Sequence, residues 1–287
     1  MKGAWTKMER TDGTIGPEDY AEPRCVLCEE PYGALPEIRA VPQRRIIEKM
    51  DEYMSRRDYA GAERHLLYWM EEAKLGRDLR GQLLLCNELI GHYRKTGERD
   101  KALARIDEAL ALVEALDFEG TISAGTTFVN AATALSAFDE PARALALFEK
   151  ARAVYEASPG TQPQLLGGLY NNMALSCAAL GRYAEALALY DRATERMADV
   201  PGGTLEQAIT CLNRADAIAA ERGEEQGEAE IAALLDRAWD LLHDPGAKRD
   251  GYYAFVCEKC APSFAFYGRF ADAEDLKQEA ERIYERA

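Results

Sequence analysis

The segment YNNMALSCAALGRYAEALALYDRA, residues 170–193, decides the fold. In its first half, apolar residues stand at positions 170, 173, 174 and 177, which is the spacing of one face of a helix. Gly181 interrupts this helix, and a second apolar face follows from Tyr183 to Ala193. Ala174 and Ala186 are small at the two places where the helices must approach closely. The segment therefore predicts a helical hairpin.

The same layout recurs along most of the chain with a period near 42 residues. The position of Ala186 belongs to a row with successive steps of 40, 42, 42, 45 and 42 residues, and a second row keeps the same steps. A fixed period predicts stacked units that bury a continuous core only against their neighbours. The first row is Ala62, Ala102, Ala144, Ala186, Ile231 and Ala273, and the second is Trp69, Ala109, Ala151, Ala193, Ala238 and Ala280.

Residues 44–287 resemble the tetratricopeptide repeat, with its aromatic-x2-Leu-Gly-x2-Tyr, Ala-x3-Phe and Ala pattern. The resemblance implies an all-α, right-handed α-solenoid of about six hairpins that begins near Arg44. Residues 1–43 would form a short irregular N-terminal extension, mostly coil, which contains a CxxC sequence. Alanine replaces the usual glycine of the repeat, and the period exceeds the basic 34 residues. The sequence is in this respect similar to the longer-repeat members, among them bacterial peptide-sensing regulators and kinesin light chains.

The sequence makes a specific local prediction at two of the joints between repeats. Thr204, followed three residues later by Gln207, has the pattern of a capping box at the start of a helix. Residues 222–227, RGEEQG, hold the three extra residues of the 45-residue step. We expect this stretch to form a protruding, solvated turn.

Composition and charge limit the classes of partner. Hydrophobic residues make up 47% of the chain, enough for a packed core, and the formal net charge is −15. A strongly acidic chain is a poor general partner for nucleic acid or anionic membrane, because both need a cationic face. No run approaches the ~20 apolar residues that span a bilayer, and residues 1–20 do not resemble a signal peptide. We expect a cytoplasmic protein, and the sequence leaves its oligomeric state open.

The seven cysteines favour packing over chemistry. An odd number without a secretion signal argues against a disulfide framework. Cys86 and Cys177 occupy core positions of their repeats, as do both cysteines of the second CxxC pair, and a free cysteine behaves as a small hydrophobe. We therefore expect no bound metal and no cofactor. The alternative is a zinc site or redox centre that uses the CxxC pairs, Cys25, Cys28, Cys257 and Cys260.

A row of asparagines is the candidate ligand-binding surface. The resemblance implies that the first helix of each hairpin lines a concave face, and asparagine recurs there in four consecutive repeats. Its amide both donates and accepts hydrogen bonds, so such a row suits the backbone of an extended peptide. The alternative is that these amides bond to one another or to nearby loops. The predicted binding residues are Asn87, Asn130, Asn171, Asn172, Asn213 and Arg214.

The favoured function is a scaffold that binds a protein or peptide segment on its concave face. His65, His92 and His243 fall in different hairpins, and the chain has neither an HExxH sequence nor a glycine-rich phosphate loop. We therefore expect no enzyme activity. The basic clamp of chaperone-binding members is matched only in part, so a chaperone tail is not the expected ligand. A peptide-responsive regulator of a partner protein and a metal-dependent or redox protein remain as alternatives.

Overall fold

The computed structural model describes residues 38–198 and 200–286, which form twelve α-helices and no strand. Residues 1–37, including Cys25 and Cys28, lie outside the described residues. The helices confirm the predicted all-α solenoid, and the first begins one residue before Arg44. They are α1 (Gln43–Ser55), α2 (Tyr59–Leu75), α3 (Leu79–Thr96), α4 (Arg99–Ala115), α5 (Ile122–Ala137), α6 (Pro141–Ala157), α7 (Pro163–Ala179), α8 (Tyr183–Met197), α9 (Thr204–Arg222), α10 (Glu224–Leu242), α11 (Gly251–Phe266) and α12 (Phe270–Tyr284).

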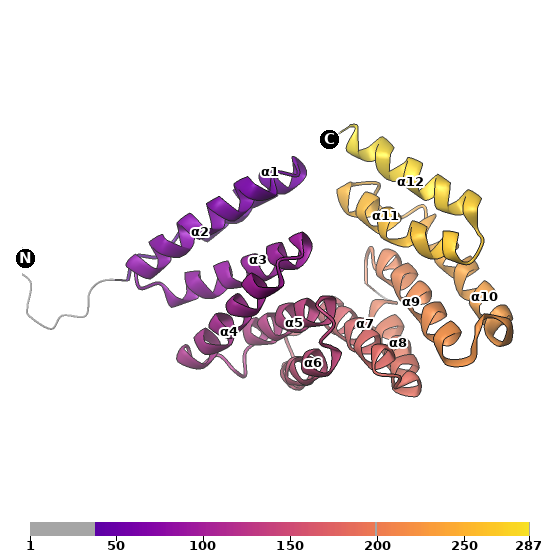
Figure 1. Cartoon of the computed structure of the whole chain (residues 1–287), viewed down its shortest axis with the longest axis horizontal. Coiled ribbons are helices and arrows are strands. Elements are labelled where there is room, and N and C mark those ends of the chain that lie inside the picture. Colours follow the sequence, from indigo (N-terminus) through magenta and orange to yellow (C-terminus); the bar gives the residue numbers. More distant parts are fainter. Residues whose placement is uncertain (1–37, 199, 287) are drawn as a thin grey trace, which may run out of the picture.

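Consecutive helices pack in pairs as six helical hairpins, the first formed by α1 and α2 and the last by α11 and α12 (Figure 1). The alanines of the two predicted rows and Ile231 are buried in the core, whereas Trp69 is half-buried. Ala62, Ala102, Ala144 and Ala186 have no exposed surface. Small side chains let the helix axes approach, and larger neighbours such as Phe148 fill the remaining space. The alanines therefore occupy the closely packed positions that the sequence predicts.

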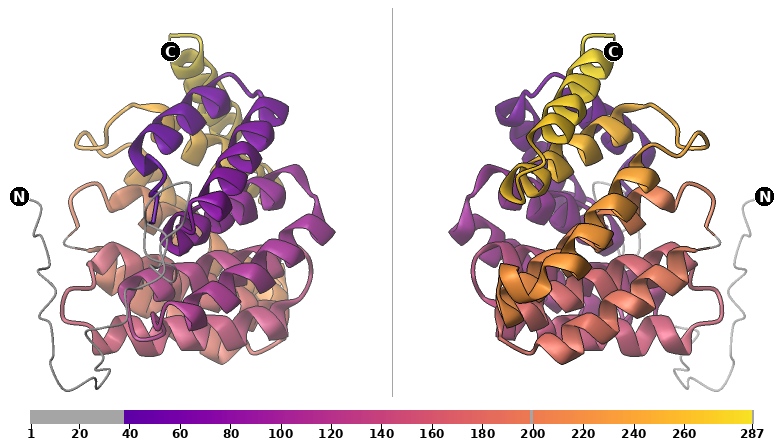
Figure 2. Two further views of the ribbon diagram at one scale, coloured as in Figure 1. Left: turned by 90° about the vertical axis from the view of Figure 1, so that its left-hand side faces the viewer. Right: turned by 90° about the vertical axis from the view of Figure 1, so that its right-hand side faces the viewer.

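The hairpins follow one another along an arch whose two ends face each other (Figures 1 and 2). The first hairpin and α12 come close at the opening, where the guanidinium of Arg57 lies 6.0 Å from the ring centroid of Tyr284. These residues are far apart in sequence. The arch thus brings the first and last repeats to opposite sides of one internal space.

The core is divided into two clusters along the arch. The first runs through the hairpins from α1 to α8 and includes Ala217 of α9, and the second joins α9 to α12. Leu187 packs against both clusters. This arrangement is typical of repeat folds, in which each unit contacts mainly its neighbours.

The predicted protruding turn at residues 222–227 is wrong. The helix α9 continues to Arg222 and α10 begins at Glu224, so only Gly223 connects them, with φ of +85°. A glycine adopts this backbone conformation readily. Two glutamates in the first turn of α10 also favour helix, since they face its positive end. The extra residues therefore lengthen the two helices, each of 19 residues.

The predicted capping box at the start of α9 is also not formed. Thr204 is the first residue of the helix, and its hydroxyl is buried without a hydrogen-bond partner among the described residues. The amide of Gln207 instead donates to the carbonyl oxygens of Met197 (3.2 Å) and Gly203 (3.3 Å). Gln207 thus ties the end of α8 to the start of α9. None of the helices described here is long and apolar enough to cross a membrane.

Candidate functional site

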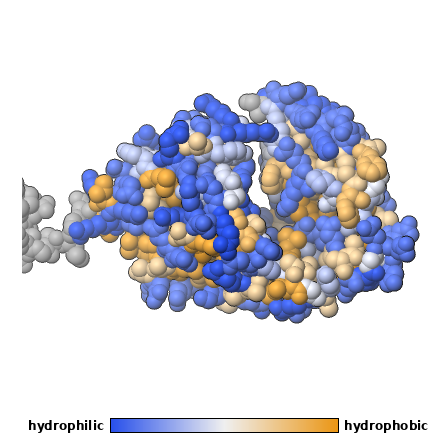
Figure 3. All heavy atoms as spheres, viewed as in Figure 1, coloured by the Kyte–Doolittle hydropathy of each residue, from blue (hydrophilic) through white to orange (hydrophobic). Residues whose placement is uncertain are grey.

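The candidate site is a cavity of about 870 Å³ on the inner side of the arch, called here the concave cavity. The space-filling view shows the gap that separates the two ends of the arch (Figure 3). Its walls come from α1, α3, α5, α7 and α11, so both ends of the chain contribute. The lining residues are Met50, Met54, Asn87, Glu88, Gly91, His92, Arg94, Lys95, Val129, Asn130, Thr133, Ala137, Asn172, Phe255 and Lys259.

Two of the predicted asparagines line the concave cavity as a bonded pair. The amide of Asn87 donates to the carbonyl oxygen of Leu83 and to the hydroxyl of Thr127, both at 3.0 Å. Asn130 donates to the side-chain oxygen of Asn87, also at 3.0 Å. The bonds from Asn87 to Thr127 and from Asn130 to Asn87 join α3 to α5. Both side chains thus hold neighbouring repeats together while facing the cavity.

A second pair joins α7 to α9 and lies outside the lining. The side-chain oxygen of Asn171 accepts hydrogen bonds from Asn213 (3.1 Å) and from the hydroxyl of Thr210 (3.3 Å). Arg214 likewise does not line the cavity. It pairs with Asp191 of α8 and lies 3.7 Å from a carboxylate oxygen of Glu230 on α10. Of the six predicted residues, the structure therefore brings three to the cavity.

Asn172 is the third, and it differs from the others. It is half-buried, lines the concave cavity and forms no hydrogen bond with another described residue. An amide at a protein wall has two donor hydrogens and an acceptor oxygen to offer. Asn172 is consequently the asparagine of the cavity lining whose amide has no partner among the described residues.

Three cations also line the concave cavity. Arg94 and Lys95 lie in the last turn of α3, and Lys259 comes from the middle of α11. Among the described residues, none of the three has a carboxylate oxygen within the 4.0 Å of an ion pair. The walls desolvate the guanidinium of Arg94 and lower its pKa, although the side chain remains solvent-accessible. The described residues therefore leave these three cations without an ion-pair partner.

Glu88 is the carboxylate of the lining. Burial raises its pKa, and the negative charge of Asp51 adds to the effect. The charge balance of the lining is thus three cations against one carboxylate. This balance is opposite in sign to the whole chain, whose formal net charge is −15.

The apolar part of the lining comes from both ends of the arch. Met50 and Met54 lie on α1, and Phe255 on α11 is 49% exposed. Tyr252 stacks on Phe255 with ring centroids 6.2 Å apart, and its hydroxyl donates to Glu206 at 2.8 Å. The sequence pattern alone did not identify Phe255. Its place four residues before Lys259 puts the two on one helix face, and this spacing is the signal that could have found it.

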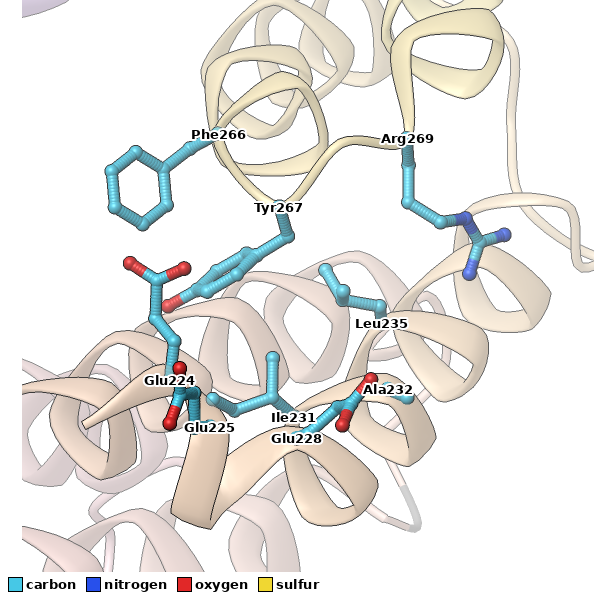
Figure 4. Close-up of a pocket in the computed structure, with 9 residues that line it drawn as sticks. All are labelled: Glu224, Glu225, Glu228, Ile231, Ala232, Leu235, Phe266, Tyr267 and Arg269. Carbon is cyan, nitrogen blue, oxygen red and sulfur yellow. The ribbon is translucent and has the colours of Figure 1, made fainter. Parts of the chain in front are cut away.

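A smaller cavity of about 450 Å³ lies between α10 and the turn that joins α11 to α12 (Figure 4). Its lining includes three glutamates of α10, with Phe266 and Tyr267 at the end of α11. The hydroxyl of Tyr267 donates to Asp216 at 2.8 Å and gives this carboxylate a partner within the chain. Burial raises the pKa of Asp216. Arg269 in the same lining already pairs with Asp236 and Asp272.

The cysteines of the described residues are placed for packing. Cys86, Cys257 and Cys260 are fully buried, and burial raises the pKa of each thiol to about 12. A thiol needs its thiolate form to act as a nucleophile or to bind a metal. These three thiols are therefore poorly suited to redox chemistry at neutral pH.

Glu63, His92 and Glu98 form the one cluster of possible metal ligands among residues 38–198 and 200–286. The ammonium of Lys101 lies 2.7 Å from a carboxylate oxygen of Glu63 and 2.5 Å from one of Glu98. Tyr93 also donates to Glu63 at 3.0 Å. Because one ammonium already contacts both carboxylates, we interpret the cluster as an ion network between α2, α3 and α4.

The comparisons with known proteins agree with this fold. Residues 82–157 match the family described as tetratricopeptide repeat. No curated protein matches the chain. BtubC (BKLC) from P. vanneervenii superimposes with a TM-score of 0.50 at 16% identity, over 85% of this chain and 91% of that one. A putative kinesin light chain from Podosopora anserina, with nearly identical TPR-like repeats, gives 0.47 at 16% identity, over 69% and 92%.

Proposed function

Because the chain is a tetratricopeptide repeat protein, we propose that its concave cavity binds a segment of a partner protein. The observation that carries the proposal is the lining itself. It combines the amide of Asn172, three cations that form no ion pair within residues 38–198 and 200–286, and the half-exposed ring of Phe255. Its volume of about 870 Å³ falls within the range of about 300–1,000 Å³ that is usual for ligand sites. A polar and apolar surface of this kind suits a peptide chain with mixed side chains.

The lining favours binding over catalysis. Its charged groups are three cations and Glu88, and His92 is buried with an unpaired Nδ1. No nucleophile in the lining contacts a base that could activate it. The proposal is therefore a scaffold without enzyme activity.

The test is capture of partners from the native cell by the full chain, followed by mass spectrometry. Phe255→Ala removes an exposed ring from the cavity, so the fold should be unaffected and the captured partner lost. The matched control is Phe270→Ala on α12, because Phe270 is 72% exposed and lines neither cavity. A partner that survives Phe255→Ala, or that is lost equally with Phe270→Ala, would place the interaction elsewhere.

A second function, ligand-responsive regulation, is favoured by the contact between Arg57 and Tyr284 across the opening of the arch. A ligand held by α3 and α11 together would pull these ends toward each other. Small-angle scattering with and without the captured partner tests this, and a smaller radius of gyration in the complex is expected. An unchanged radius of gyration would indicate a scaffold that does not change shape when it binds.

A further inference from the structure

We infer that the smaller cavity, between α10 and the turn that joins α11 to α12, binds an arginine side chain of a partner protein (Figure 4). Its lining shares no residue with the lining of the concave cavity. The inference therefore goes beyond the proposed function and does not depend on it. The evidence is the combination of exposed aromatic rings and carboxylates around one space of about 450 Å³.

Three carboxylates stand along one side of the smaller cavity. Glu224, Glu225 and Glu228 lie on the first two turns of α10, and all three are exposed. Figure 4 shows the carboxylate of Glu224 next to the rings of Phe266 and Tyr267. A guanidinium is planar and presents its N–H groups as a fork that matches the two oxygens of a carboxylate. A guanidinium that entered the cavity would therefore meet acceptors and rings together.

The aromatic wall consists of Phe266 and Tyr267 at the end of α11. Phe266 is 65% exposed, and its ring centroid lies 5.0 Å from that of Tyr267 in an edge-on arrangement. Burial raises the pKa of Tyr267, and the hydrogen bond to Asp216 and the charges of Asp216 and Glu224 raise it further. The two rings therefore stand in a negative potential. The face of an aromatic ring attracts a cation, so the potential and the rings favour the same kind of ligand.

The chain itself combines an arginine, a ring and a carboxylate at three other places among the described residues. In each, the guanidinium lies 4.1–5.6 Å from a ring centroid and forms an ion pair with a carboxylate. The three sets are Arg192 with Tyr170 and Glu156, Arg249 with Tyr253 and Glu279, and Arg269 with Phe264 and Asp236. At the smaller cavity, rings and carboxylates come together in the same way, but on an exposed surface that an arginine of another protein can reach.

The floor of the smaller cavity is apolar and suits the aliphatic part of an arginine side chain. Ile231, Ala232 and Leu235 of α10 form this floor. Figure 4 shows Ile231 and Leu235 between the glutamates of α10 and the ring of Tyr267. Arginine lays its methylene groups along apolar surface while its charged end reaches polar groups. The floor, the rings and the carboxylates thus match the successive parts of one arginine side chain.

The test uses the full chain and a short fluorescent synthetic peptide in which two arginines flank one leucine. Binding is followed by fluorescence anisotropy, and thermal melts verify that each variant is folded. We expect Glu228→Lys to weaken binding about tenfold or more, since it replaces an attraction by a repulsion. The matched control is Glu281→Lys on α12, which makes the same charge change at an exposed residue outside both cavities. The control should bind the peptide as the unmodified chain does.

The ring and the guanidinium are tested separately from the charge. Phe266→Leu keeps an apolar side chain at this exposed position but removes the aromatic face, so it should weaken binding about threefold without changing the melting temperature. The same peptide with lysine in place of arginine should bind more weakly, and the peptide with uncharged citrulline should not bind. Equal binding of either peptide, equal loss in both lysine variants, or unchanged binding by Phe266→Leu would overturn the inference.

Two further measurements locate the peptide and its competitor. Phe255→Ala alters the concave cavity alone and should leave binding of the arginine peptide unchanged, whereas a loss would place the peptide in that cavity and overturn the inference. Carbodiimide joins a lysine amine to a carboxylate that it contacts. A cross-link in the chain without peptide, from Glu225 or Glu228 to Lys2 or Lys7, would also overturn it, because the chain would then supply the cation. Failure of the arginine peptide would leave the proposed function of the concave cavity unaffected.

Discussion

The inner helices have two faces with different chemistry, and α7 shows the contrast within five residues. Tyr170, Met173 and Ala174 face the core and are at most 1% exposed, while Asn172 between them faces the concave cavity. The core face is apolar and closely packed. The cavity face carries an amide and, on α3 and α11, cations that have no ion-pair partner among the described residues. We therefore expect stability to depend mainly on the core face and binding mainly on the cavity face, and substitutions should separate the two.

The largest effect is expected on the core face. Ala174→Leu and Ala186→Leu each force a larger side chain between two packed helices, so each should destabilise the fold by about 1–3 kcal/mol. Ala179→Leu is the control, because Ala179 is exposed at the end of α7 and should tolerate the change. Urea unfolding at matched pH measures all three. Equal stability of Ala174→Leu and Ala179→Leu would show that the close-contact rows are misassigned.

The core face was predictable from the sequence because its signal is repeated. Alanine at Ala62, Ala102, Ala144 and Ala186 marks positions where only a small side chain fits, and each repeat supports the others. The turn at Gly223 was not predictable in this way. A count of extra residues does not say whether they enter a loop or lengthen two helices.

The cavity was only partly predictable, for a different reason. The asparagine row correctly indicated the inner helices, yet Asn171 turns to Asn213 and Arg214 turns to Asp191. The partner that a side chain contacts depends on its rotamer and on its neighbours, and a repeat pattern specifies neither. The approach of α11 to α3 depends on small rotations that accumulate over several hairpins. The curvature of the whole arch therefore places Lys259 and Phe255 in the lining of the same cavity as Arg94.

A smaller effect is expected for two tyrosines of the core face, whose hydroxyls differ. The hydroxyl of Tyr170 donates to Glu156 at 2.9 Å and accepts from Arg192 at 2.7 Å. Tyr190 is fully buried, and its hydroxyl has no partner among the described residues. Tyr170→Phe should therefore cost about 1.5 kcal/mol, whereas Tyr190→Phe should cost nothing or stabilise the fold. Each variant serves as the control for the other when both are measured by thermal melting. Equal losses of stability would contradict the assigned hydrogen bonds of the two hydroxyls.

The asparagines test whether the cavity face also contributes to stability. Between α3 and α5, Asn87 donates one hydrogen bond to Thr127 and accepts one from Asn130, so Asn87→Ala should destabilise the fold by about 1 kcal/mol. Asn172→Ala should leave the melting temperature unchanged, because that amide has no partner among the described residues. It should instead weaken binding of the captured partner. Lost stability with unchanged binding in Asn172→Ala would assign this residue to the scaffold.

The smallest effect, and the one with a distinct pH signature, is expected for Glu88. Burial and the nearby Asp51 raise its pKa, so the folded state disfavours the ionised carboxylate relative to the unfolded chain. Glu88→Gln should therefore stabilise the fold slightly near pH 7, by about 0.5 kcal/mol given its partial exposure. As the pH falls through the raised pKa, the native carboxyl becomes neutral and the advantage of the variant should disappear. The control is Glu281→Gln on the exposed surface of α12, which should not change stability. A stability gain of Glu88→Gln that is independent of pH would mean that the charge of Glu88 is not its cause.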